Sequence, residues 1–131
     1  MSNLGPPGSA TVLVCITCRG AADPADAPRA GLALAEATAV AAANTSDISV
    51  QQIRCLGNCS RGLSAVIRCD SAWTYIFGGL DAARDGLPLI EGARLLAHAP
   101  DGIMPWRGRP EPLKKGLIAR VPPLHFREES L

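Results

Sequence analysis

The stretch "SATVLVC", residues 9–15, decides the fold that the sequence predicts. It is a short run of apolar and β-branched residues, which is typical of a buried strand. Residues 16–31 are rich in Gly, Pro and Asp and predict a loop, in which Pro28 can open a helix because the first helical turn leaves N–H groups unbonded. The alanine-rich residues 29–44 predict that helix, and "DISVQQIRC", residues 47–55, predicts a second strand. The two strands of such a β-α-β unit are expected to be parallel, with a right-handed crossover.

The middle of the chain predicts two antiparallel strands and a second helix. "LSAVIRC", residues 63–69, and "AWTYIFG", residues 72–78, flank Asp70 and Ser71, which is the pattern of a hairpin. "PLIEGARLLAHA", residues 88–99, has one apolar helical face and is closed by Pro100. The order β-α-β-β-β-α is that of a thioredoxin-like fold, so we expect an α/β protein with a four-stranded mixed sheet.

Composition indicates one folded domain with flanking segments. Apolar residues make up 47% of the 131 residues but aromatic residues only 4%, so we expect an aliphatic, alanine-rich core. We expect residues 1–10 to be a flexible leader and residues 11–100 to be a thioredoxin-like domain that binds a metal or cluster. Residues 101–131 are rich in proline and basic side chains and predict an extended C-terminal arm, with one short helix near residues 113–119.

Several classes of function are disfavoured. A net charge of +1 gives no electrostatic reason to expect nucleic acid or an anionic membrane as a partner. No apolar run approaches the roughly 18 residues of a membrane span, and "MSNLGPPGSA" has no cationic and apolar secretory signal. We therefore expect a cytoplasmic protein. The sequence has no phosphate-binding glycine loop and no Ser-His-Asp pattern, so we expect a protein that is not an enzyme.

Four of the five cysteines follow the two predicted parallel strands. An odd number of cysteines without an export signal argues against a disulfide framework and favours metal ligands or redox thiols. Cys15 and Cys18 come at the end of the first strand, and Cys55 and Cys59 at the end of the second. Parallel neighbours end at the same edge of a sheet, where sites of open α/β sheets lie. We therefore predict a four-thiolate site made by these cysteines.

The spacing favours a [2Fe–2S] cluster among the possible occupants. Zinc ribbons usually carry two matching C-x2-C turns, whereas "CLGNC" at residues 55–59 has three residues between its cysteines. Gly57 and Gly62 suit a loop that wraps a cluster. Zinc, a thioredoxin-type dithiol at Cys15 and Cys18, and four plain buried cysteines are the alternatives. Three arginines next to the cysteines could offset the negative charge of a cluster: Arg19, Arg54 and Arg61.

The remaining candidate ligands have simpler explanations. Cys69 lies in the predicted hairpin, where it is expected to act as a small apolar residue, a substitute ligand being the alternative. His98 is expected to meet the C-terminal end of a helix, and His125 lies in the arm. Nothing in the sequence places the two histidines together near the cysteines, as a Rieske-like site would need.

Two resemblances support these predictions. "CLGNCSRGLSAVI", followed by a hairpin and a helix, resembles the second half of thioredoxin-like [2Fe–2S] ferredoxins. The chain is more similar still to a family of small bacterial proteins described as predicted metal-binding, over roughly residues 11–123. The shared motifs are the C-x-x-C-R start, the CLG-x-C-x-R-G centre, the "TYIFGGL" strand and the "LKKGLIARVPP" tail. Cys15 and Cys18 are closer together in sequence than the first two ligands of the ferredoxins usually are.

The resemblance implies an electron-transfer function. It implies a ferredoxin that passes single electrons from a reductase to an acceptor enzyme, in an association with cobalamin biosynthesis. The alternative is a zinc- or cobalt-binding module with a structural or metal-delivery role. The resemblance also implies a homodimer. An alternating aromatic row and the apolar groups between Met104 and Leu124 support it, because such groups need cover. The members of the aromatic row are Trp73, Tyr75 and Phe77.

Overall fold

The computed structural model describes residues 9–19, 23, 24, 26 and 28–130. Most of the predicted leader, residues 1–8, lies outside these ranges. The helices and strands follow in the order β1 (Ala10–Cys15), α1 (Ala30–Ala42), β2 (Ile48–Ile53), the 3-10 helix η1 (Cys59–Arg61), β3 (Ala65–Arg68), β4 (Thr74–Phe77), α2 (Gly86–Ala97), α3 (Glu111–Lys115) and β5 (Leu117–Val121).

The strands form one mixed sheet in the order β2-β1-β3-β4-β5. β1 and β2 are parallel, with Cys15 opposite Ile53. The other neighbouring pairs are antiparallel, and Ser71 has a positive φ of 64° in the turn between β3 and β4. The predicted β-α-β unit and the predicted hairpin are both confirmed.

The start of α1 is packed directly on the end of β1. The backbone N–H of Gly31 donates to the carbonyl of Cys18, with an N···O distance of 2.9 Å. A methyl group at Gly31 would collide with the carbonyl oxygen of Cys15, so only glycine allows this close approach. The helix therefore holds the loop that carries the first cysteine pair.

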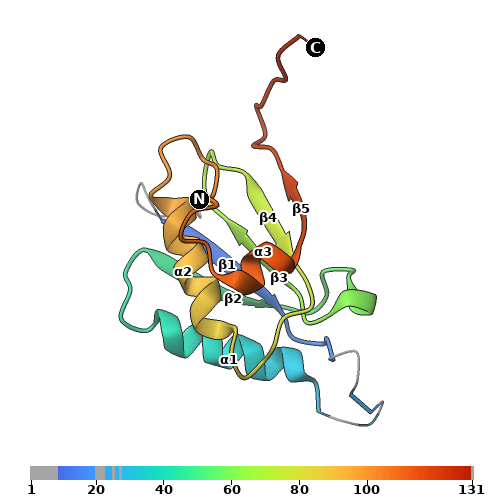
Figure 1. The fold of residues 1–131 in the computed structure, drawn as a ribbon. Coiled ribbons are helices and arrows are strands. Elements are labelled where there is room, and N and C mark those ends of the chain that lie inside the picture. Colours follow the sequence, from blue (N-terminus) through green and yellow to red (C-terminus); the bar gives the residue numbers. More distant parts are fainter. Residues whose placement is uncertain (1–8, 20–22, 25, 27, 131) are drawn as a thin grey trace.

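All three α-helices lie on one side of the sheet (Figure 1). α1 packs on α2, and both contact β1. The core forms between these helices and the facing side chains of the sheet, of which Val12, Ile67 and Phe77 are fully buried. On the opposite face, Leu13 and Val66 pair across β1 and β3, and no helix of the described ranges covers that face. In the described part of the chain, no helix is long and apolar enough to cross a membrane.

The predicted four-stranded sheet is wrong in one respect, because the sheet has a fifth strand. β5 lies within the segment predicted to be an extended arm, and it pairs with β4. α3 precedes it and carries Leu113, which is fully buried. Met104 is also buried, and its N–H donates to the hydroxyl of Tyr75 at 2.9 Å. The segment from Met104 to Val121 thus completes both the sheet and the core.

The aromatic row does not provide the surplus apolar surface expected of it. Tyr75 and Phe77 are buried, at 1% and 0% exposure, and belong to the core under the helices. Trp73 lies just before β4 and is partly exposed, with its ring in an edge-to-face contact with Phe126 at 5.2 Å between centroids. The helix layer covers Tyr75 and Phe77, so these two side chains offer no apolar surface to a second copy of the chain.

We expect the leucine in α3 to contribute strongly to stability. Leu113→Ala should lower the free energy of unfolding by about 2–5 kcal/mol, because it removes a fully buried side chain and leaves a cavity. Chemical denaturation monitored by circular dichroism measures the change. Leu87→Ala, at a position 57% exposed, is the matched control and should change the value by less than about 0.5 kcal/mol. Equal effects of the two substitutions would show that α3 is not part of the core.

Candidate metal centre

Cys15 and Cys18 form a buried pair at the end of β1. Their exposed fractions are 1% and 3%, and their Sγ atoms are 3.1 Å apart. The backbone turns between them so that both thiols point to one place, as two ligands of one metal ion must. This C-x-x-C turn thus brings its two thiols together.

Cys55 and Cys59 lie on the loop that follows β2, and both are exposed. Gly57 has a positive φ of 73°, which lets the loop turn so that its N–H points at Cys55 Sγ, 3.2 Å away. Cys59 opens η1. All five cysteines of the chain are free thiols.

The two loops are joined by several hydrogen bonds at the shared edge of the sheet. The N–H of Ile16 donates to the carbonyl of Ile53 at 2.9 Å. The hydroxyl of Thr17 donates to the carbonyl of Arg54, and the thiol of Cys15 lies 3.5 Å from the same oxygen. Parallel pairing of β1 and β2 therefore places both cysteine pairs at one edge, as predicted.

A second set of contacts holds the loop after Cys55 against β3 and β4. Asn58 Nδ2 donates to Ser64 Oγ at 2.9 Å, and the N–H of Gly79 donates to the carbonyl of Arg61 at 2.7 Å. A methyl group at Gly62 would lie 3.2 Å from Cys18 Sγ. The loop of the exposed pair is thus in contact with the buried pair.

The four thiols are not all within ligating distance of one another. Among the residues that the structure describes, no three His, Cys, Asp or Glu side chains are gathered as a metal site. The buried pair offers half of a four-thiolate site, and the exposed pair stands beside it on a loop. The donor set fits a four-thiolate group in kind, whereas in placement the structure brings together only the buried pair.

The two buried thiols differ in acidity. Burial raises the pKa of Cys15, but hydrogen bonds from the thiol of Cys18 and the backbone at Leu56 outweigh it, so the pKa is lowered overall. For Cys18, burial and the neighbouring Cys15 raise the pKa to about 11. Without metal, Cys15 is therefore the thiol that ionises first.

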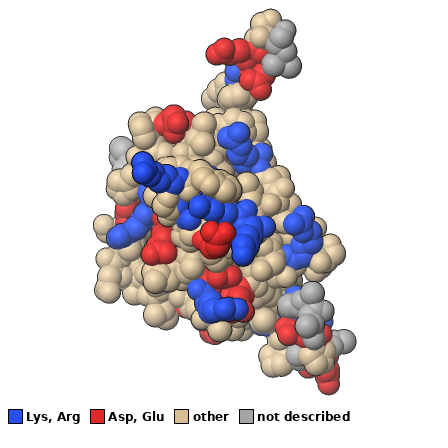
Figure 2. Space-filling model, in the orientation of Figure 1, with Lys and Arg blue, Asp and Glu red and all other residues tan. Residues whose placement is uncertain are grey.

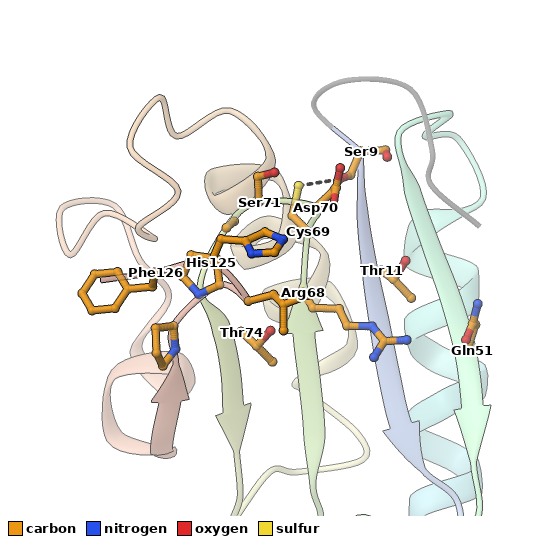
Figure 3. A pocket seen from close by; sticks show the side chains of 14 residues that line it. Ser9, Thr11, Gln51, Arg68, Cys69, Asp70, Ser71, Thr74, His125 and Phe126 are labelled. Atoms are coloured by element: carbon orange, nitrogen blue, oxygen red, sulfur yellow. Dashed lines mark hydrogen bonds between the residues drawn. The ribbon is translucent and has the colours of Figure 1, made fainter. Parts of the chain in front are cut away.

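Cys69 lies at the other end of β1 from this edge. Its thiol donates to the carbonyl of Ser9 at 2.6 Å, and burial, with the nearby charge of Asp70, raises its pKa. It borders a cavity of about 730 Å³ between the helix-free face of the sheet and the C-terminal residues 122–126. His125 and Arg68 border the same cavity (Figure 3). The sequence did not indicate this cavity, because it is formed by pairing β5 with β4.

His98 caps the end of α2, where its Nδ1 lies 2.9 Å from the carbonyl oxygen of Arg94. His125 lines the cavity beside Cys69. Of the three arginines expected near the cysteines, Arg54 and Arg61 are exposed and Arg19 is partly buried.

The arrangement of strands and cysteines defines a thioredoxin-like α/β protein with a thiol-rich edge. It resembles a structure of a thioredoxin-like [2Fe–2S] ferredoxin from Aquifex aeolicus, at 18% identity and a TM-score of 0.56, over 90% of this chain and 98% of that chain. A crystal structure at 1.5 Å resolution of the wild-type thioredoxin-like [2Fe–2S] ferredoxin from Aquifex aeolicus gives 16% identity and a TM-score of 0.54, over 85% and 97% of the two chains. The chain belongs to the family described as "Protein of unknown function (DUF1636)", whose model matches residues 12–123. No match was found among the curated proteins.

We expect the acidity of the buried pair to be measurable in metal-free protein. In a Cys55→Ser, Cys59→Ser, Cys69→Ser variant, the ultraviolet absorbance of thiolate should rise in two separate steps. The first, from Cys15, should lie below the ordinary thiol pKa of 9.0 and the second, from Cys18, near 11.

The same variant should be less stable at high pH. Because the pKa of Cys18 is higher in the folded than in the unfolded protein, stability from this thiol is present below pH 9 and is lost as pH rises through about 11. Adding Cys18→Ser should remove the second absorbance step and reduce the loss of folding stability at high pH. A single step for two thiols in the parent variant would contradict the assignment.

Proposed function

We propose that this protein is an electron-transfer protein of the thioredoxin-like [2Fe–2S] ferredoxin type, with Cys15, Cys18, Cys55 and Cys59 as the cluster ligands. The observation that supports it most is the buried thiol pair, with Sγ atoms 3.1 Å apart, beside a loop that carries two more thiols. The fold adds support, since the solved structures that it resembles are named as [2Fe–2S] ferredoxins.

The residues of the chain would have different roles in such a site. Cys15 and Cys18 are shielded from solvent and would hold the inner side, while the exposed Cys55 and Cys59 would hold the outer side. A bound [2Fe–2S] cluster supplies storage of one electron. The N–H of Gly57, which already points at Cys55 Sγ, is placed to stabilise negative charge on sulfur.

The partners follow from this role. We propose a reductase that supplies the electron and an acceptor enzyme that takes it, so the protein itself catalyses no reaction. The assignment to cobalamin biosynthesis rests on the family resemblance alone, and we keep it as part of this proposal together with a cytoplasmic location. Neither a nucleic acid nor a membrane is a proposed partner.

Anaerobic purification with counts of iron and acid-labile sulfide tests the proposal. Red-brown protein with charge-transfer absorption between about 400 and 600 nm and two irons per chain supports the cluster. Colourless protein with one zinc or cobalt per chain would replace the ferredoxin with a metal-binding module. Metal-free protein that cycles between a Cys15–Cys18 disulfide and the dithiol would replace it with thiol redox chemistry.

We expect single cysteine substitutions to separate ligands from other thiols. Cys59→Ser should lose most of the bound metal and lower the melting temperature, because a metal held by both cysteine pairs would add to the stability of the folded protein. Cys69→Ser is the matched control and should keep the metal, since Cys69 lies at the far end of β1 from Cys15. Iron content and visible absorption measure both. Bleaching by Cys69→Ser, together with intact colour in Cys18→Ser, would show that the ligand assignment is wrong.

We also propose a homodimer. The supporting groups are exposed apolar side chains near the helix-free face of the sheet, at Val121, Leu124 and Phe126, which are 46%, 91% and 40% exposed. Light scattering on the full chain should give twice the chain mass of 13.6 kDa at micromolar concentration. The variant Leu124→Asp, Phe126→Asp should shift it toward the monomer, and a monomeric mass for the unmodified chain would refute the dimer.

A further inference from the structure

Positive charge is concentrated in one segment of an almost neutral chain. Residues 103–121 hold five Lys and Arg residues and one acidic residue, Glu111, giving this segment a net charge of +4. Since the whole chain has a net charge of +1, all other residues together have a net charge of −3. The cations of the segment are Arg107, Arg109, Lys114, Lys115 and Arg120.

Aromatic rings hold several of these cations in place. Lys114 Nζ lies 4.9 Å from the centre of the Trp106 ring, and the guanidinium of Arg120 lies 4.1 Å from the centre of the Trp73 ring. Arg109 is buried, at 8% exposure, and lies 5.2 Å from the Trp106 ring, where it donates to backbone carbonyls of the preceding loop. Arg109 therefore orders the loop, while the other four cations are exposed or partly exposed.

The cations of this surface are not neutralised within the protein. Arg84, which pairs with Asp81, lies outside this surface. In the ranges that the structure describes, Lys114, Lys115 and Arg120 are unpaired, and so is Arg61 on the cysteine loop. Figure 2 shows Lys and Arg side chains spread over the region of α3 and β5, with few acidic side chains among them.

A hollow joins this basic surface to the cysteine loop. It has a volume of about 390 Å³, and its walls include Ser60, Arg61 and Gly62 on one side and Lys115 and Gly116 on the other. Arg61 is two residues from Cys59. A molecule bound over Lys115 and Arg61 would therefore lie beside the exposed cysteine pair.

The hollow is not built to hold a free phosphate. The N–H groups of Gly78, Gly79 and Gly116 already donate to backbone carbonyls, so these three glycines do not form a ring of free donors as in a phosphate-binding loop. What it offers to an anion is the side-chain charge of Lys115 and Arg61. Carboxylate side chains on another protein match such a surface, which combines separate cations with an exposed aromatic ring, Trp106 at 61% exposure.

We propose that the surface formed by Arg61, Lys114, Lys115, Arg120 and Trp106 is the docking site for an acidic protein partner. The partner's carboxylates pair with the cations, and the rim of the partner's contact surface covers the hollow beside the cysteine loop. This inference rests on the proposed function only in what the two proteins exchange, which is an electron. The docking itself does not require a bound cluster.

The surface is better suited to a protein than to nucleic acid. A nucleic acid site needs several cations along a phosphate backbone, and most of its affinity comes from them. Here the exposed cations are few and the chain outside this segment is net negative. An acidic protein with a contact surface of limited area can bind the cations and the Trp106 ring together.

Binding of a defined acidic probe tests the proposal. The probe is a fluorescein-labelled peptide of alternating Glu and Leu residues, titrated with the full-length protein as purified and followed by anisotropy at low salt and at 0.5 M salt. We expect salt-sensitive binding by the unmodified protein. Lys114→Glu with Lys115→Glu should weaken it roughly tenfold or more, because two favourable charge pairs become two unfavourable ones.

A control with the same change in net charge decides whether the site is local. Arg68→Glu with Arg127→Glu alters Arg68 on the helix-free face and Arg127 in the C-terminal residues, and should change the affinity less than twofold. Equal losses in the two double variants, no binding at low salt, or tighter binding of a DNA duplex of equal charge would each overturn the proposal. If the peptide binds as expected but the protein holds no iron, the docking surface stands and the ferredoxin proposal fails.

Discussion

The parallel pairing of β1 with β2 is the constraint on which the rest of the structure depends. Because Cys15 pairs with Ile53, the two strands end at the same level, and each strand is followed by a loop that carries a cysteine pair. The link between the strands is α1, whose start is fixed on β1 by the absence of a side chain at Gly31. A shift of the register would separate the two loops and remove the hydrogen bond that the carbonyl of Arg54 accepts from the hydroxyl of Thr17.

The difference in burial between the cysteine pairs has a physical consequence. Two buried thiols close together are costly to ionise together, and the opposite directions of the pKa changes at Cys15 and Cys18 express this cost. A positively charged metal removes it, because both thiolates are then paired with the metal charge. Cys55 and Cys59 are exposed on the loop beside this pair. In our proposal the buried pair forms the inner half of the site and the exposed pair forms the outer half.

The parts of this fold that local sequence determines were predictable, and those that depend on long-range pairing were not. The first strand, the alanine-rich helix and the hairpin around Asp70 and Ser71 each have a local pattern that only one element satisfies. β5 has no such pattern: five residues between Gly116 and Pro122 become a strand because the edge of β4 offers them backbone hydrogen bonds. The same holds for Leu113, whose burial depends on the space above Gly92 in α2.

The same difference between local sequence and long-range contacts applies to the candidate site. The placement of four cysteines at one edge follows from parallel strands and was predicted, whereas the exposure of Cys55 and Cys59 depends on how the loop lies on β3 and β4 through Asn58 and Gly79. That loop contact also decides what a partner can reach. The buried pair is closed off by α1 and the sheet, so in the proposed function an electron would leave this edge on the side of Cys59 and Arg61. The segment that supplies β5 and α3 puts its unpaired cations on that same side, so in our proposal one C-terminal addition both completes the core and marks where a partner binds.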